Sequence, residues 1–301
     1  MDRIGVKGGA LVSTLVSGAL VAGALSAAPT ANATCASFFG IGNSANCKSN
    51  LTSIAIAIGP NAKALADFGY FGVSLSVGAD AVAFTPGIFT VATAVGDNAQ
   101  SVAGGFFSIA TTLGANGVAS AGGQGLNIAL NVTPATTVPN GSGVVADGFG
   151  NVGVNLFGSG TDVEKHLIRA AGILNTSVNL GGTDNKVWAG EGSDVLNGAF
   201  NALGSGNFVA TGGGGGLNLA FKTFGNGNLV IAGPGPVAIA GSILQNGQPT
   251  TKSGPGFNIN GFKVGGAAAV APKKTAAPSA TAHASGRKAA ASGAGHSRRS
   301  G

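Results

Sequence analysis

Charged residues are scarce in this chain of 301 residues. Asp, Glu, Lys and Arg make up 9% of it, against about 25% in ordinary soluble domains, while glycine alone accounts for 55 residues. Such a composition is compatible with disorder, but Ile, Val and Leu alternate with small residues through most of the chain, which is typical of strands that pack. We therefore expect the body of the chain to be folded.

Histidine is also scarce, and this limits the catalytic chemistry that the chain can support. His166 is the one histidine in the body, while His283 and His296 lie near the C-terminus. A Ser-His-Asp triad would have to use His166, and the sequence supplies no positioned nucleophile beside it. We expect a solvated histidine there, and we predict no catalytic residue, no bound cofactor and no metal site.

The scarce charges are unevenly distributed. Residues 34–266 hold eight Lys or Arg and nine Asp or Glu, a net charge of −1, whereas residues 267–301 carry a net charge of +6 with no acid. That segment is rich in Ala, Ser, Pro and Gly and is predicted to be a disordered basic tail. Its basic residues are candidates for contact with the envelope: Lys273, Lys274, Arg287, Lys288, Arg298 and Arg299.

Residues 1–33 have the pattern of a secretory signal peptide. Arg3 and Lys7 precede an apolar stretch over 10–25, and Ala31-Asn32-Ala33 forms an Ala-x-Ala cleavage site. The alternative is an uncleaved membrane anchor, although the apolar run is short for a span. We predict export, and a secreted protein that is extracellular or associated with the cell surface.

The two cysteines, Cys35 and Cys47, lie close to the predicted mature N-terminus. An oxidising compartment favours one disulfide between them, and free or metal-binding thiols are the alternative. We expect residues 34–50 to form an N-terminal cap in which Phe38, Phe39 and Ile41 fold over the open end of the first repeat.

Residues 51–139 contain a repeat. Strand-like alternating runs close at positions 59, 78, 96, 114 and 133, which are 19, 18, 18 and 19 residues apart. When the runs are stacked, aliphatic residues align in columns, one of which contains Ile54, Val73, Val91, Ile109 and Ile128. A fixed period of this length predicts an all-β fold, a parallel β-solenoid (β-roll or β-helix) whose stacked coils bury a continuous core.

Each coil also carries a second run with small residues on one face, for example Ala62, Ala64 and Ala66. We expect a thin, flattened coil in which large aliphatics on one wall face alanines on the other. Phe71, Phe89, Phe107 and Leu126 recur seven residues before four of the closing positions, and we expect them to fill a corner column.

Two segments of this region carry a resemblance to a known family. The stretch from Ser53 through Gly59-Pro60-Asn61-Ala62-Lys63-Ala64, and its echo from Thr93 to Ala99, resemble the head repeats of trimeric autotransporter adhesins. The resemblance covers about residues 53–133. It implies a left-handed parallel β-roll, assembly into a homo-oligomer and adhesion to host matrix. The overall composition resembles exported glycine-rich proteins of actinobacteria.

The repeat is interrupted after residue 139. Thr161-Asp162-Val163-Glu164 has the pattern of a capping box, and we expect one short helix over 161–171, within a loop-and-helix insertion at 140–174. Alternation returns with a looser period over 175–266, which predicts a second stretch of solenoid. Asn185, Asn207 and Asn228 are spaced by 22 and 21 residues, and stacked asparagines can hydrogen-bond along a ladder.

Taken together, these features predict a non-enzymatic structural or adhesive surface protein, whose partner is an anionic cell-wall polymer or a membrane surface. Export makes nucleic acid an unlikely partner. One alternative is a polysaccharide-active enzyme on a solenoid scaffold, which would need acids and bases to converge on one groove. Another is a calcium-stabilised repeat protein, because residues 189–197 approach the calcium-binding nonapeptide in one copy.

Overall fold

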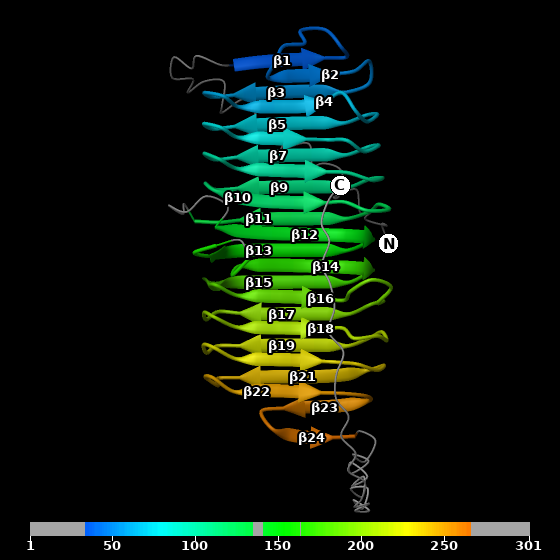
Figure 1. Ribbon diagram of the computed structural model, residues 1–301, viewed down its shortest axis with the longest axis vertical. Coiled ribbons are helices and arrows are strands. Elements are labelled where there is room, and N and C mark those ends of the chain that lie inside the picture. Colours follow the sequence, from blue (N-terminus) through cyan, green and yellow to red (C-terminus); the bar gives the residue numbers. More distant parts are fainter. Residues whose placement is uncertain (1–33, 135–140, 163, 266–301) are drawn as a thin grey trace, which may run out of the picture. The chain divides into compact units, whose positions relative to one another are not determined.

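The computed structural model describes residues 34–134, 141–162 and 164–265. The regular elements of these residues are all β-strands, with no helix among them. The strands follow one another in chain order along a single axis (Figure 1), and two long sheets contain all of them. The predicted all-β parallel solenoid is confirmed. The predicted signal peptide and basic tail lie outside the described residues.

One sheet, sheet A, has 13 strands and the other, sheet B, has 11. Sheet A contains β1 (Thr34–Phe38), β3 (Ile54–Ile58), β5 (Val73–Val77), β7 (Val91–Val95), β9 (Ile109–Leu113), β11 (Ile128–Val132), β13 (Val152–Ser159), β15 (Thr176–Thr183), β17 (Gly198–Ala202), β19 (Leu219–Thr223), β21 (Ala238–Ile243), β23 (Gly256–Ile259) and β24 (Phe262–Val264). Sheet B contains β2 (Cys47–Ser49), β4 (Lys63–Ala66), β6 (Val82–Phe84), β8 (Gln100–Ala103), β10 (Gly117–Ala121), β12 (Ser142–Phe149), β14 (Leu167–Ile173), β16 (Lys186–Ala189), β18 (Phe208–Thr211), β20 (Leu229–Ala232) and β22 (Pro249–Lys252).

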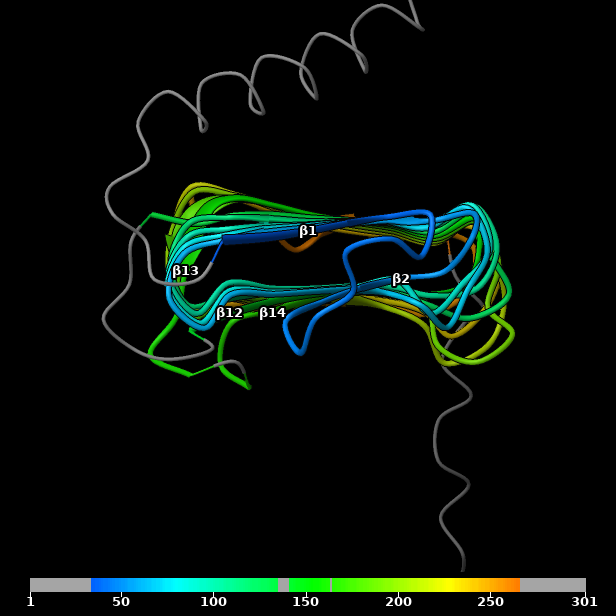
Figure 2. The same cartoon turned by 90° about the horizontal axis from the view of Figure 1, so that it is seen from above.

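The register between coils follows the columns of the sequence. Ile54 pairs with Val73, and the same parallel register continues through Val91, Ile109 and Ile128. Viewed along the axis, the coils superimpose as two flat layers joined by corners at both sides (Figure 2). The predicted repeat of 18 or 19 residues is therefore one coil of the solenoid, and the flattened cross-section is confirmed.

The direction of the side chains reverses the prediction for the core. In β3, Ala55 and Ala57 are fully buried, whereas Ile54, Ile56 and Ile58 point to the outside of sheet A and are partly exposed. In sheet B, Ala64 and Ala66 of β4 are likewise fully buried. Alternation predicts that the two faces of a strand differ, but not which face lies inside. Small residues line both walls because the two flat layers leave little room between them.

The core changes character along the axis. From β12 onward the inner wall of sheet B carries larger side chains, all fully buried: Val144, Ile168, Val187, Val209 and Val230. The inner wall of sheet A opposite them carries Asn131, Asn155, Asn179 and Asn201, which are also fully buried. Large aliphatics therefore do face small or polar residues across the core, but only in the second half.

The predicted helix over 161–171 is wrong. Leu167–Ile173 is strand β14, in which Ile168 pairs with Val144 on one side and with Val187 on the other. The candidate capping residue Thr161 instead donates through its backbone N and its Oγ1 to Asp184 Oδ1, at 2.9 and 3.2 Å. A capping box contributes about 1 kcal/mol, whereas β14 pairs along both of its edges, and that pairing overrides the local signal. Val163 lies outside the described residues.

The predicted column of aromatic residues lies at the corner that leads into sheet A. Phe71, Phe89 and Phe107 stack with centroid distances of 4.6 and 4.9 Å. Their rings are 41–50% exposed, so the column lines the outside of the corner and does not fill it. All three residues have positive φ, between 52 and 56°.

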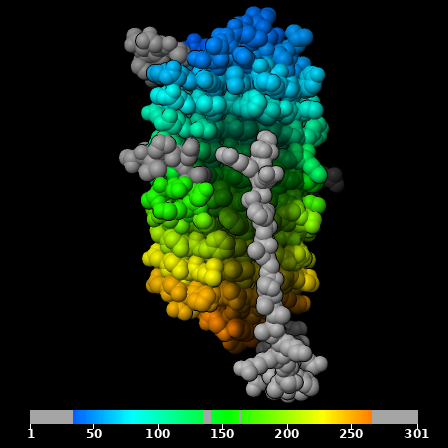
Figure 3. Space-filling view, in the orientation of Figure 1, coloured from blue at the N-terminus to red at the C-terminus, as the bar shows by residue number. Residues whose placement is uncertain are grey.

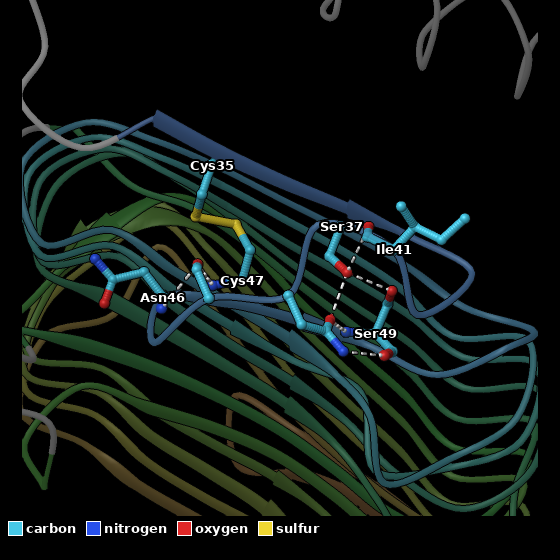
Figure 4. Close-up of a disulfide and its surroundings, with 8 residues drawn as sticks. Cys35, Ser37, Ile41, Asn46, Cys47 and Ser49 are labelled. Atoms are coloured by element: carbon cyan, nitrogen blue, oxygen red, sulfur yellow. Dashed lines mark hydrogen bonds between the residues drawn. A yellow bond between two sulfur atoms is a disulfide. The ribbon is translucent and has the colours of Figure 1, made fainter.

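Both ends of sheet A carry an antiparallel strand, with β1 pairing to β3 and β24 to β23. The predicted disulfide between Cys35 of β1 and Cys47 of β2 is present and joins the two sheets at the N-terminal end (Figure 4). Ser37, Cys47 and Ser49, not the phenylalanines, are the buried residues of this cap, and Ser37 Oγ lies 2.6 Å from Ser49 Oγ. Phe38, Phe39 and Ile41 remain 44–78% exposed, contrary to the prediction.

A matched pair of substitutions in β7 tests which side chains face inward. Ala94→Leu places a large side chain at a fully buried position, and we expect it to lower the free energy of unfolding by about 1–3 kcal/mol through overpacking. Thr93→Leu, one residue earlier and pointing outward, should change it by less than about 0.5 kcal/mol. Urea denaturation measures both free energies of unfolding. A larger loss for Thr93→Leu than for Ala94→Leu would contradict the assignment of inward and outward side chains.

The disulfide should contribute to stability because it restricts the unfolded chain. For cysteines 12 residues apart, the loop-entropy model gives about 3 kcal/mol, so the double variant Cys35→Ser/Cys47→Ser should unfold at a lower urea concentration. A reductant should shift the native protein to the same midpoint and leave the variant unchanged. An equal response of both proteins to the reductant would argue against a stabilising disulfide.

Candidate functional site

The outer side of sheet A forms a continuous uncharged surface, which we call the apolar face. Three side chains of each strand point outward, at the first, third and fifth positions of β3, and the same three columns continue through the sheet. From β3 to β21 none of these outward side chains is charged. The first column consists of Ile54, Val73, Val91, Ile109, Ile128, Val152, Thr176, Gly198, Leu219 and Ile239.

The apolar face is large for an exposed surface. Ten spacings separate β3 from β23 in the sheet, which corresponds to about 48 Å, and five residues of strand add about 16 Å across, giving roughly 770 Å². The largest apolar patch on an ordinary monomer is about 300–600 Å², and larger patches mark interaction sites. The face is therefore a candidate binding surface. It is the flat outer side of a sheet and not a cleft.

A corner column of apolar residues borders the first column of the apolar face. It consists of Phe71, Phe89, Phe107, Leu126, Leu174, Leu196, Leu217 and Val237. All eight have φ between 52 and 60° and side chains 41–58% exposed. Glycine or asparagine tolerates this conformation best, whereas a bulky residue there costs on the order of 1–3 kcal/mol. The column thus extends the apolar surface around the corner at positions where a polar or small residue would be less strained.

The outer side of sheet B differs from the apolar face in charge. Lys48, Lys63, Arg169 and Lys186 lie at outward positions of β2, β4, β14 and β16. The two broad surfaces of the solenoid are therefore chemically unlike each other. Figure 3 shows the coils as closely packed bands that follow one another in chain order.

A pocket on sheet B brings acidic and basic side chains into one lining. Arg169, Trp188 and Glu191 are among the residues that line this open depression of about 280 Å³. Glu191 is the one carboxylate in its lining, whereas glycoside hydrolysis generally uses two carboxylates. The pocket lacks the pair that the polysaccharide-active alternative needs.

His166 lies inside the solenoid, not in solvent as predicted from the sequence. It is fully buried, and its Nδ1 accepts a hydrogen bond of 3.1 Å from the backbone N of Asn185. Because Nδ1 accepts, the proton sits on Nε2, which lies 3.2 Å from Asn155 Oδ1 and donates to it. Burial lowers the pKa of His166 to about 4, with a smaller opposing effect from Asp184. The side chain is a neutral structural bridge between coils.

Asparagine ladders run along the axis, and the sequence predicted one of them. Asn207 Nδ2 donates to Asn185 Oδ1 at 3.1 Å, and Asn228 Nδ2 to Asn207 Oδ1 at 3.3 Å, which confirms that column. A second ladder inside sheet A joins Asn131, Asn155, Asn179 and Asn201 at 2.6–2.9 Å. Its members lie 24, 24 and 22 residues apart in the sequence, a spacing that could have revealed it.

Lys222 continues the inner wall of sheet A after Asn201 and is fully buried. Its Nζ donates to the carbonyl oxygens of Leu203 and Gly225. Burial lowers the pKa of Lys222 to about 8. No sequence pattern indicated a buried lysine, because Lys222 is flanked by residues of an ordinary alternating strand.

The calcium-like stretch over 189–197 forms a turn. Asp194 Oδ2 accepts from the backbone N of Glu191 at 3.1 Å, and Asp194 N donates back to the Glu191 carbonyl at 3.0 Å. Among the described residues, no three of His, Cys, Asp or Glu gather as a metal site would require.

The predicted functional residues divide between two regions. Cys35 and Cys47 meet in the cap, whereas the basic residues of the tail, from Lys273 to Arg299, lie outside the described residues. The described segments include no helix that is long and apolar enough to cross a bilayer. No family model, curated protein or solved structure matches this chain.

The buried His166 predicts a loss of stability in mild acid. The unfolded chain binds a proton on this residue below about pH 6.5, but the folded chain does so only near pH 4. The stabilising contribution is complete above pH 6.5 and is lost as the pH falls towards 4, by about 3 kcal/mol in total. Urea denaturation at several pH values measures this loss. His166→Gln should flatten the dependence, and an unchanged slope in that variant would assign the effect to other groups.

Proposed function

We propose that this chain is a secreted, non-enzymatic structural or adhesive protein of the cell surface. The observation that carries the proposal is the apolar face of sheet A, which runs along the solenoid without a charged side chain from β3 to β21. An exposed apolar surface of this extent is unfavourable in water unless a partner covers it. A rigid rod with one such side is suited to assembly and attachment.

Export is supported by two features at the N-terminus. Residues 1–33 have the sequence pattern of a signal peptide, and the disulfide between Cys35 and Cys47 is consistent with an oxidising environment. A disulfide that joins the first strands of the two sheets would persist outside the cytosol and would protect the end of the solenoid there.

A binding role is favoured over the enzymatic alternative by the distribution of polar side chains. His166 and Lys222, which have shifted pKa values, are both enclosed in the core. The sheet B pocket presents Arg169 with a single carboxylate, Glu191. Neither arrangement pairs an acid and a base across a groove, as a hydrolytic mechanism would require.

In this proposal the basic tail provides the second attachment. The six Lys and Arg residues of 267–301 have no acidic neighbour within that segment, so it can bind anionic wall polymers or headgroups electrostatically. The described body contains more balanced charge, and its apolar face offers no attraction for a polyanion. We therefore assign envelope attachment to the tail and association to the apolar face.

Removing residues 267–301 should release the protein from the cell-wall fraction into the medium. A full-length variant in which Lys273, Lys274, Arg287, Lys288, Arg298 and Arg299 are all replaced by Gln is the matched control, because it keeps the length of the tail and removes only its charge. Fractionation followed by immunoblotting measures the retained share. Both variants should be released, and raised salt should release the native protein.

Retention of the truncated chain at the native level would rule out attachment by the tail. Release of the truncated chain with full retention of the Gln variant would show that the tail acts through something other than charge, which also contradicts the proposed mechanism.

A further inference from the structure

Two strands of the apolar face have complementary patterns of large and small outward side chains. The outward side chains of β9 are Ile109, Thr111 and Leu113, which run large, small, large. Those of β17 are Gly198, Phe200 and Ala202, which run small, large, small. Each strand therefore has the shape that would fit the other, provided that two such surfaces lie face to face.

The small residue at one end of β17 lies in a measurable hollow. Gly198 lines a shallow depression of about 330 Å³, together with Leu174, Leu196 and Leu217 from the corner column. Leu219 narrows it on one side, since its Cδ1 lies 3.2 Å from the place where a Cβ on Gly198 would be. The lining is mostly apolar but also includes Thr176, Asn197 and Asn218, and the side chain of Ile109 from a second copy would pack there beside Leu219.

The neighbouring strands have a weaker form of the same relation. β7 presents Val91, Thr93 and Val95, and β19 presents Leu219, Phe221 and Thr223. The ring of Phe221 lies over Gly241 of β21, which spreads its bulk across two strands. The two phenylalanines of the central column thus lie in the C-terminal half of the face, and the two threonines of that column lie in the N-terminal half.

The positions of these strands define a symmetry. In the order of sheet A, β9 lies two strands before β13 and β17 two strands after it, while β7 and β19 lie three strands away. A two-fold axis along β13 would place the face of one copy on that of another with the solenoid axes antiparallel. Each outward column would then face itself, so that Thr111 meets Phe200, and Ile109 meets Gly198.

We propose that the apolar face binds a second copy of this chain in that arrangement, as an antiparallel two-fold dimer centred on Val154 of β13. This inference rests on the proposed role of the apolar face as an interaction surface, but not on the role of the tail. Face-to-face packing of parallel solenoids would instead oppose Phe200 to Phe200.

The size and chemistry of the face are suited to such a dimer. Its area of roughly 770 Å² is close to the 800 Å² that each partner contributes to a standard stable interface. No charge from β3 to β21 would be buried, so the dimer needs no ion pairing. Both copies have the same strand spacing, and the coils superimpose without visible twist (Figure 2), so matching side chains stay in step along the whole length.

The mass of the protein in solution tests the pairing. Light scattering of the native protein should give twice the mass of one chain. Thr111→Arg buries an unpaired charge in the interface and should raise the dissociation constant by at least about 100-fold, giving the mass of one chain. Ser120→Arg, which points outward from sheet B in the same coil, is the matched control and should remain a dimer.

Cysteine cross-linking tests the orientation. Opposed sheets pack about 10 Å apart, which is too far for a direct disulfide, so the test uses a bismaleimide with a spacer of similar length. It should join two Val154→Cys chains but not two Ser120→Cys chains. A mixture of a Thr111→Cys chain and a Phe200→Cys chain should cross-link, whereas Thr111→Cys alone should not. Electrophoresis after treatment with the bismaleimide measures these products, and circular dichroism verifies that each variant is folded.

Three results would overturn the proposal. The first is a native protein that has the mass of one chain in solution. If that single chain also floats with phosphatidylcholine vesicles, the face binds lipid and not a second copy. The second is a Thr111→Arg variant that remains a dimer. The third is a cross-link formed by Thr111→Cys alone, or none formed by Val154→Cys. If the protein does not dimerise but its tail still retains it in the cell-wall fraction, the attachment proposal stands without the dimer. If the protein dimerises but is not retained, the dimer stands without the attachment proposal.

Discussion

The close approach of two flat parallel sheets is the constraint on which the rest of this structure depends. The coils superimpose along the axis (Figure 2), so every inward position is repeated at each coil and must satisfy the same narrow space. Alanine and serine fit there in the first half, as at Ala55, Ala92 and Ser74, all fully buried. A core of small residues buries little apolar area per residue. The backbone ladders and the polar ladders therefore carry a large share of the cohesion between coils.

The interior polar groups follow from the same geometry. Where the inner wall of sheet B enlarges to Ile168 and Val187, the opposite wall presents asparagines that bond to the coils above and below them. An amide has both donors and an acceptor, so one residue type repeated at one position can satisfy itself along the stack. His166 joins this network as a neutral ring between Asn155 and the backbone of Asn185. Its position explains why the one histidine of the body is structural.

The same constraint sends the large aliphatic side chains outward. In the first half of the solenoid the inner positions take small side chains, so residues such as Ile54 and Leu75 lie on the outside of sheet A and form part of the apolar face. Sheet B, which carries Lys63 and Lys186 outside, does not share this character. The solenoid is therefore two-sided, and the apolar face is the side that we propose for association. The large and small outward side chains of β9 and β17 follow opposite patterns, so the apolar face is not flat at these two strands.

The sequence by itself determined the fold class, the register and the disulfide. Equivalent positions must stack in a repeat, so the spacing of Ile54, Val73 and Val91 was sufficient to place them in one column, and two cysteines near one end left one possible disulfide. The helix over 161–171 was mispredicted, because a capping box is a local signal and the pairing of Ile168 with two neighbouring strands is not local. Only the tertiary structure decided which side of each strand lies inside. Alternation has the same period for either choice, and the selection is made by the distance between the sheets, which no single coil contains. The apolar face depends on which side of each strand lies inside, so the sequence alone could not reveal it.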